Sequence, residues 1–211
     1  NPVMVGPRNP TTLAYVLGQY SVLPRKIVSI LTRAKTRAAR DGWEAVVDEL
    51  IINIRQEKGG DTKGKPHYQI LADGILEDFD LSLRGIKDGA ATRSFFRQLS
   101  LDLKHPTLAH AMGSAYAFES SAVPELRIVY QLLADLARQS NRTIGGSLQG
   151  FFDYHLEVWE PGHEAGLRLA CQKYLLTDAD RASFLEGFLA IMQSMEEWWA
   201  GMAEEATRLP H

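Results

Sequence analysis

Six ionisable side chains in three separated segments are the residues of this sequence that could do chemistry together. They are carboxylates and imidazoles in equal number: Glu57, His67, Glu119, His155, Glu160 and His163. Mixed oxygen and nitrogen donors suit redox iron or manganese, whereas a structural zinc site would usually draw on cysteine pairs. The sequence has a single cysteine, Cys171. The residue types therefore favour a non-haem site, with the ligand set that a pair of iron ions would need.

The densest of the three segments is FFDYHLEVWEPGHEAGL, residues 151–167. Glu160 and His163 are three positions apart and share a helix face. His155 and His163 are eight apart, which leaves about 80° of rotation between them on a regular helix. One extra residue, as in a π-bulge, would align all three, and Pro161 favours such an irregularity because it lacks a backbone N–H. The alternative is a helix end here, with both histidines on the surface.

Glu119 is a lone acid in a nearly uncharged stretch, residues 109–124, that is rich in Ala and Ser. A helix with small or apolar residues on most faces is usually buried, and an unpaired buried carboxylate is costly. A divalent cation would offset that cost. A hydrogen-bonded core acid, or a solvent-facing residue near Pro124, remains open as an alternative.

Glu57 and His67 flank a Gly-rich loop between two predicted helices. Gly59 and Gly60 allow the chain to reverse, so that both side chains could face one interior point. The alternative is exposure to solvent, because helix ends beside polar loops are normally wet. Taken alone, this pair is a weak signal.

The elements that must position these residues read as helices, because apolar residues recur with a period of about 3.6 and strand-like alternation is scarce. A first helix is predicted from Thr11 or Thr12 through Ile30, and a second from a capping box at Asp41-Gly42-Trp43-Glu44 to Gly59. A third starts near Pro66. Further helices are predicted at residues 90–103, 107–121, 124–139, 147–173 and 178–206, with loops at 80–89 and 140–146. The prediction is one all-α domain over residues 1–211, with seven to eight helices.

The bulk composition excludes several classes of function. The net charge of −3 and a pI near 6.1 give no electrostatic footprint for nucleic acid. We expect no membrane span, because no apolar run reaches the length needed to cross a bilayer. One cysteine suits a reducing compartment, so we expect the cytoplasm. The N-terminus lacks the apolar region of a secretory signal and does not begin with Met, which predicts a trimmed or processed start.

The order of these residues resembles the haem-oxygenase-like diiron oxidases, a family that includes the chlamydial protein associating with death domains (CADD). Its helical fold is shared with haem oxygenase, thiaminase-II-like proteins and the pyrroloquinoline-quinone synthesis oxidase. The family pattern is a Glu, a Gly-containing loop and a His, then a lone Glu, then His-x-x-x-Asp-x-x-His. Residues 53–67, 116–124 and 155–163 are similar to these three parts. The third part departs from the pattern in two ways. It has Glu160 in place of the Asp, and four residues rather than three separate this acid from His155. Trp159 occupies the regular position, and Glu157 is an alternative acid.

The resemblance implies that two ferrous ions activate dioxygen, which then oxidises a small biosynthetic substrate in an apolar cavity; manganese is the alternative metal. It implies that Glu57, His67 and Glu119 hold one part of the site and His155, Glu160 and His163 the other, with Glu119 bridging. It also implies an external electron donor and a homodimer. The side chains that we expect to line the substrate pocket are Tyr20, Tyr116, Phe152 and Trp159.

Two other functions fit the same sequence. The first is a metal-free enzyme of this fold, either a thiaminase-II-like hydrolase with Cys171 as nucleophile or a cofactorless oxidase with His155 and His163 as acid and base. The second is a non-enzymatic interaction module. That hypothesis predicts that Glu57, Glu119 and His155 lie far apart or on the surface.

Overall fold

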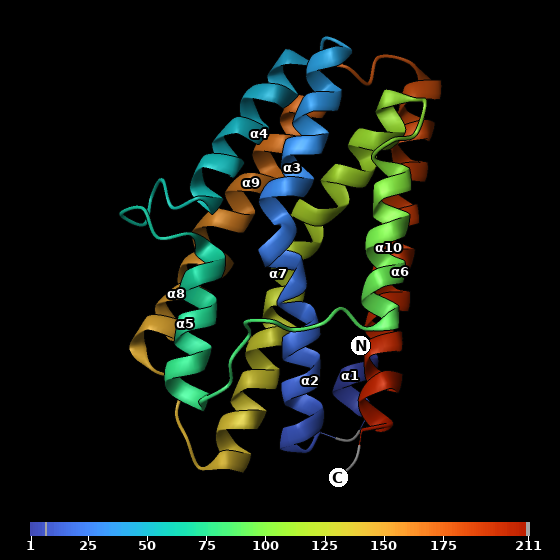
Figure 1. The fold of residues 1–211 in the computed structure, drawn as a ribbon. Coiled ribbons are helices and arrows are strands. Elements are labelled where there is room, and N and C mark those ends of the chain that lie inside the picture. Colours follow the sequence, from blue (N-terminus) through green and yellow to red (C-terminus); the bar gives the residue numbers. More distant parts are fainter. Residues whose placement is uncertain (7, 210–211) are drawn as a thin grey trace.

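The periodic apolar residues of the sequence form a bundle of helices (Figure 1). The structure is a computed structural model that describes residues 1–6 and 8–209, and its regular elements over those residues are all helical. They are α1 (Pro2–Val5), α2 (Pro10–Tyr20), α3 (Val22–Arg40), α4 (Glu44–Glu57), α5 (His67–Phe79), α6 (Ala90–Asp102), α7 (Leu108–Ser140), α8 (Gly146–Tyr154), the π-helix η1 (His155–Trp159), α9 (Glu160–Gln172) and α10 (Asp178–Thr207). This confirms the predicted all-α fold.

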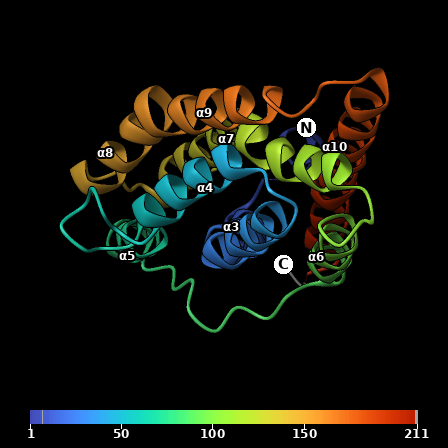
Figure 2. The same cartoon turned by 90° about the horizontal axis from the view of Figure 1, so that it is seen from above.

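The helices pack mostly along their lengths. The two longest, α7 and α10, pack on each other, while α3 packs on α4, α4 on α9 and α5 on α8. In a view from above, along the helix axes, α3 lies between α4 on one side and α6 and α10 on the other (Figure 2). The predicted loop at residues 80–89 crosses in front of the α2–α3 junction (Figure 1), where the Gln19 side chain donates to the Lys87 carbonyl and accepts from Gly89 N–H.

One predicted break between helices is wrong. The helices expected at 107–121 and 124–139 form one helix, α7, which continues through Pro124. A proline removes only one backbone hydrogen bond within a helix, and buried residues on both sides, such as Phe118 and Leu126, hold the two halves in one core. The segment expected at 147–173 is continuous, but it contains the π-helical turn η1.

The predicted capping box at Asp41 is also wrong. Asp41 belongs to the end of α3, where its carboxylate pairs with Arg37 at 3.0 Å and with Arg40 at 2.9 Å. The next helix begins three residues later, at Glu44, after Trp43, whose ring stacks on Tyr174 at 4.8 Å. The Tyr174 hydroxyl also accepts from the Ala45 N–H at 2.9 Å, so Tyr174 contacts the first turn of this helix twice.

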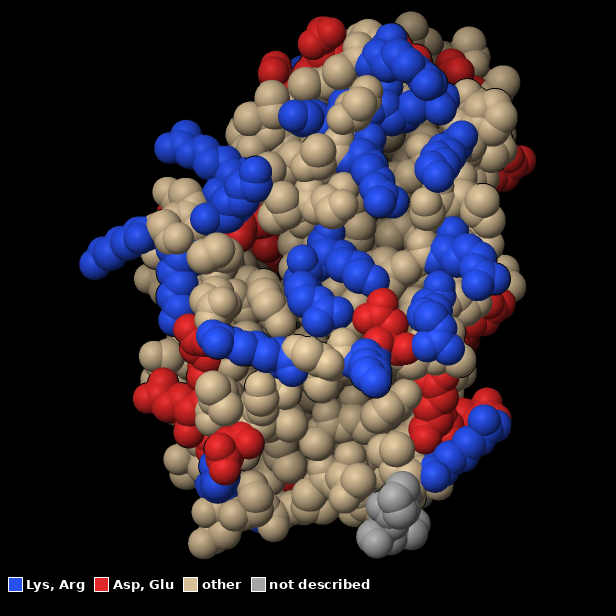
Figure 3. All heavy atoms as spheres, viewed as in Figure 1, with Lys and Arg blue, Asp and Glu red and all other residues tan. Residues whose placement is uncertain are grey.

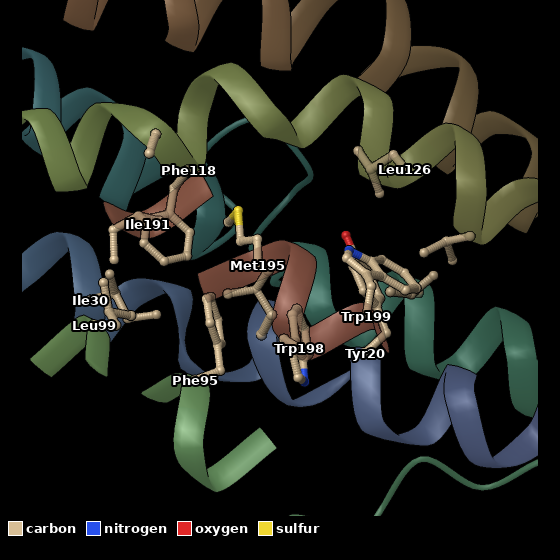
Figure 4. Close-up of a cluster of buried hydrophobic side chains, with 14 of the residues drawn as sticks. Tyr20, Ile30, Phe95, Leu99, Phe118, Leu126, Ile191, Met195, Trp198 and Trp199 are labelled. Atoms are coloured by element: carbon tan, nitrogen blue, oxygen red, sulfur yellow. The ribbon is translucent and has the colours of Figure 1, made fainter. Parts of the chain in front are cut away.

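Stacked aromatic rings fill the core between α2, α6 and α10 (Figure 4). Phe95 and Trp198 stack with their centroids 4.7 Å apart, and Tyr20 stacks on Trp199 at 5.6 Å. The buried Trp198 indole N–H donates to the Thr92 hydroxyl at 3.0 Å. This core anchors α2 and α10 and fixes Tyr20 at the edge of the cavity described below. Over the described residues, no helix is both long and apolar enough to cross a membrane.

Candidate metal centre

The structure brings all six predicted side chains together where α4, α5, α7, η1 and α9 meet. Each is buried, with an exposed fraction of 2 to 9%: Glu57, His67, Glu119, His155, Glu160 and His163. Five of them border one internal cavity, and the sixth, His163, contacts two of the five. Segments up to about half the chain apart in sequence therefore converge on one point.

The loop between α4 and α5 sets the first pair. Gly59 has a φ of +94°, and a Cβ there would lie 2.7 Å from the backbone of Gly64 and Lys65. Only glycine fits this tight reversal. It places His67 Nδ1 at 3.5 Å from Glu57 Oε1.

The other nitrogen of the His67 ring, Nε2, lies 3.0 Å from the Asp61 carboxylate and donates to it. The opposite nitrogen, Nδ1, is buried without a hydrogen-bond partner. Burial alone would lower the pKa of His67, but Glu57 and Asp61 outweigh it, so the pKa is raised. Asp61 thus directs the free lone pair of Nδ1 toward Glu57.

The π-helical turn η1 sets the second group. The Glu160 N–H bonds to the His155 carbonyl, five residues back, so the turn holds one more residue than an α-helical turn. Glu160 is 8% exposed and borders the cavity with His155, whereas Glu157 points to solvent. The extra residue predicted between His155 and Glu160 is therefore absorbed as a π-bulge, and Glu160, not Glu157, is the acid that faces inward.

The His155 ring is held in one tautomer. Its Nδ1 lies 2.7 Å from the Phe151 carbonyl, and since a carbonyl only accepts, Nδ1 carries the proton. Burial lowers the pKa of His155 to about 3, so the ring is neutral. The lone pair of Nε2 is left to bind a ligand, which is the state that metal coordination requires.

The His163 ring is oriented by Gln56 on α4. Its Nε2 lies 2.7 Å from the Gln56 side-chain oxygen, which fixes the proton on Nε2. The other nitrogen, Nδ1, lies 3.7 Å from both Glu119 Oε2 and Glu160 Oε2. The second oxygen of Glu119 accepts from the Asn53 amide at 3.2 Å.

Buried negative charge dominates the cluster. Burial raises the pKa of Glu119 to about 8, and the charge of Glu160 adds to the effect. Burial also raises the pKa of Glu160. Burial would lower the pKa of His163, but Glu160 and Glu119 raise it to about 9. A cation at this point would offset the charge of the carboxylates and lower all three pKa values.

The donor atoms have the arrangement of a metal site. One donor each from Glu57, Glu160 and His163 lies within 4.8 Å of the others. The contacts of 3.5 to 3.7 Å are longer than hydrogen bonds. Two donors that each lie about 2.1 Å from one ion stand about 3.0–3.4 Å apart, so modest contraction suffices. With the unpartnered Nδ1 of His67, this donor set fits a hard or borderline divalent metal.

The four aromatic residues expected around a substrate are separated by the fold. Tyr20 borders the cavity. Trp159 packs inside the cluster, stacked on His67 with centroids 4.4 Å apart. Phe152 lies in the core against Tyr130, and the Tyr116 hydroxyl donates to Glu164, away from the cavity walls.

Sequence reasoning missed the residues that orient the imidazoles and one further acid. The orienting groups are Gln56, Asp61 and the Phe151 carbonyl, and nothing in the sequence marks them. The further acid is Glu125, which is 5% exposed and borders the cavity. It could have been found, because it begins an apolar helical stripe that continues with the buried Val129 and Leu132.

Comparison with known proteins places this geometry in a family. The chain resembles two crystal structures of a CADD-like protein of unknown function from Nostoc punctiforme PCC 73102. One has a TM-score of 0.88 and 32% identity over 94% of this chain and 84% of that chain. The other has a TM-score of 0.89 and 30% identity over 100% of this chain and 88% of that chain.

A sequence relative carries a functional name. The 4-chloro-allylglycine synthase of Streptantibioticus cattleyicolor is 27% identical over 165 residues, 76% of this chain. The chain spans 60% of that protein's length. Residues 3–205 match the family described as a domain of unknown function with solved structure, DUF3865. The chain therefore belongs to the DUF3865 family, whose fold is that of the CADD-like helical proteins.

Proposed function

We propose that this protein is a non-haem diiron oxidase that uses dioxygen to oxidise a small organic molecule. The observation that carries the proposal is the buried cluster of three carboxylates and three imidazoles, in which each imidazole has one nitrogen occupied by an orienting partner and the other left for a metal. Helical bundles that hold carboxylate and imidazole ligands on facing helices are the usual frame of di-iron sites. The relative named as a biosynthetic synthase supports an enzymatic role.

The residues divide the work in a simple way. Glu57, His67 and Glu119 would hold one metal position, and His155, Glu160 and His163 would hold the other. Two ferrous ions bound there would supply two of the four electrons that reduce dioxygen to water, the substrate would supply the other two, and an external donor would restore the ferrous state. The protein excludes bulk water, because all six side chains are buried.

The alternatives predicted from the sequence receive less support. Cys171 is 1% exposed, burial raises the pKa of its thiol to about 12, and it does not border the cavity, which argues against a nucleophilic cysteine. A base at His155 would be weak, since its pKa is lowered to about 3. The hypothesis of an interaction module predicted that Glu57, Glu119 and His155 lie far apart or on the surface. Their burial around one cavity contradicts that prediction.

The test is metal content combined with oxygen consumption. Protein purified without chelators and loaded anaerobically with Fe(II) is expected to bind about two iron ions per chain and to consume oxygen when mixed with air. The Glu119→Ala variant is expected to lose at least half of this iron while its circular dichroism spectrum stays helical. The His105→Gln variant is the matched control, because His105 lies outside the cluster, and it should retain full iron.

The opposite result is equally clear. If the wild-type protein holds no iron and Fe(II) brings no gain in oxygen uptake, the cluster is a structural network of buried acids and histidines. An unchanged iron content in Glu119→Ala would likewise show that the cluster is not the iron site.

A further inference from the structure

Glu125 is a buried acid that the six-residue cluster does not include. It follows Pro124 on α7 and is 5% exposed. Its side chain borders the same cavity as Glu119, His155 and Glu160. It is not one of the six clustered side chains, and a second role at the same cavity would account for its burial.

The protein side chains described around the cavity offer Glu125 no permanent positive charge. Within the described chain, neither a lysine nor an arginine borders the cavity, and its basic residues, His67 and His155, belong to the cluster. Lysine and arginine gather instead on the outer surface (Figure 3), for example in the shallow groove formed by Arg33, Arg37, Arg40 and Lys104. An unpaired buried carboxylate is costly, so this position favours an incoming cation.

The protonation of Glu125 agrees with this geometry. Burial raises the pKa of Glu125 to about 8, the Ser121 hydroxyl opposes that rise, and the charge of Glu160 adds to it. A cationic ligand would stabilise the ionised form. The same group would repel a carboxylate, because like charges at a buried site disfavour each other.

Glu125 also stands where a ligand would enter. Ser121 and Glu125, one helical turn apart, border both the inner cavity and a surface groove between α7 and α10. The groove is lined by apolar side chains, among them Ile128, Leu189 and Met192, and by a second acid, Glu196. Among its described lining residues there is again no lysine or arginine. The route toward the cavity thus carries two acidic side chains on an apolar surface.

The rest of the cavity wall is apolar. Leu23, Ile27 and Leu31 of α3 and Leu71 of α5 line it. Tyr20 and Leu126 also line the cavity, and the Tyr20 ring stacks on Trp199 (Figure 4). A ligand that suits these walls has a short aliphatic part and one positively charged group.

We propose that Glu125 binds the protonated amino group of the substrate, and that the substrates are small aliphatic amines whose alkyl part packs against α3. The inference rests on the proposed function, because it assigns a substrate class to the same cavity. Glu125 is then a positioning and specificity residue: it holds the amine so that the carbon chain lies beside the metal cluster.

The test is the selectivity of binding, measured by isothermal titration calorimetry with n-pentylamine, 1-pentanol and pentanoate as probes of equal length. The wild-type protein, assayed as purified under anaerobic conditions, is expected to bind pentylamine at least tenfold more tightly than either of the others. Glu125→Gln should lose at least this tenfold preference and keep its weak affinity for pentanol. Glu125→Asp keeps the charge and should recover part of the preference.

The matched control is Glu186→Gln on α10, which removes an exposed acid that borders neither the cavity nor the groove. It should change the pentylamine affinity by less than about twofold, since exposed charges contribute little. Iron content is measured on every variant. Glu125→Gln should hold as much iron as the wild-type protein, because Glu125 is not a ligand.

Three results would overturn the inference. The first is that the wild-type protein does not bind the amine, or binds amine and alcohol equally tightly. The second is an unchanged preference for the amine in Glu125→Gln. The third is loss of iron from Glu125→Gln. Failure of the proposed function looks different. It would appear as a lack of iron in the wild-type protein, whatever its preference among the three probes.

Discussion

At the scale of residues, the site depends on how each imidazole is held. His67, His155 and His163 each give one ring nitrogen to a fixed acceptor: a carboxylate, a backbone carbonyl and a side-chain amide, respectively. Such partners set the tautomer and raise the basicity of the remaining nitrogen. For two of the three rings the orienting partner adds no negative charge to the site, because a carbonyl and an amide are neutral.

Gln56 is the partner whose removal is most informative. Gln56→Leu keeps the volume of the side chain but leaves the His163 N–H without an acceptor, so the ring is free to turn away from Glu119 and Glu160. We expect iron affinity to fall by about 10- to 100-fold. Competition with a fluorescent chelator under anaerobic conditions measures this.

The control for that variant is Gln193→Leu on α10, where the amide bonds only to the exposed Glu197. It should leave iron affinity unchanged. Equal affinity in Gln56→Leu and the wild-type protein would show that Gln56 does not orient the ring.

Some residues of the site could be predicted from the sequence and others could not. The six clustered residues stood out because acids and histidines are conspicuous in apolar or Gly-rich surroundings, as Glu119 is. Gln56 and Asp61 carry no such signal, because an exposed-looking polar residue near a helix end is ordinary until the opposing helix is known. Their role is created by contacts such as that between Gln56 and His163, which are 107 positions apart.

At the scale of elements, the π-helical turn η1 decides which acid faces the metal. Its hydrogen bond joins the His155 carbonyl to the N–H of Glu160, five positions later. Without it, Trp159 would take the inward position. The sequence predicted this irregularity from the spacing of the ligands and from Pro161. It did not predict the continuity of α7 through Pro124, because packing that holds both halves of a helix cannot be read from local signals.

Deleting one residue tests the role of this turn. Val158 lies in η1 and is 56% exposed. Removing it should convert the segment to a regular α-helix and leave His155, Glu160 and His163 on one face, at spacings of four and three. We expect iron content to be retained and the melting temperature to be equal or higher.

The matched deletion is Gly162, which lies between Glu160 and His163. Removing it should rotate His163 by about 100° away from the cluster, so iron should be lost. If the two deletions had the same effect on iron content, the π-helical turn would not be what aligns the ligands.

At the scale of the whole molecule, the buried acids make stability depend on pH when no metal is bound. Glu119 and Glu125 have pKa values raised from 4.5 to about 8, and His163 has a pKa raised from 6.5 to about 9. A raised folded-state pKa stabilises the protein below the unfolded-state value, and this stability is lost as pH rises through the folded-state value. The lowered pKa of His155, about 3, acts oppositely and weakens the fold only below about pH 6.5.

The metal-free protein should therefore lose stability between about pH 6.5 and 9. We expect its melting temperature, measured by circular dichroism in excess chelator, to fall by at least about 4 °C over this range, since 1 kcal/mol corresponds to about 2–4 °C in a chain of this size. With excess Mn(II) the trend should reverse, because metal binding requires deprotonated ligands. A flat or rising profile in chelator would contradict the assigned buried charges.

The most direct measurement of the central claim is an anomalous-scattering map at the iron edge, from crystals soaked anaerobically with Fe(II). Two peaks about 3.5–4 Å apart are expected between α4, α5, α7, η1 and α9. Glu57, His67 and Glu119 would contact one peak, and His155, Glu160 and His163 the other. The absence of any peak among these six side chains, or a peak elsewhere in the molecule only, would contradict the account.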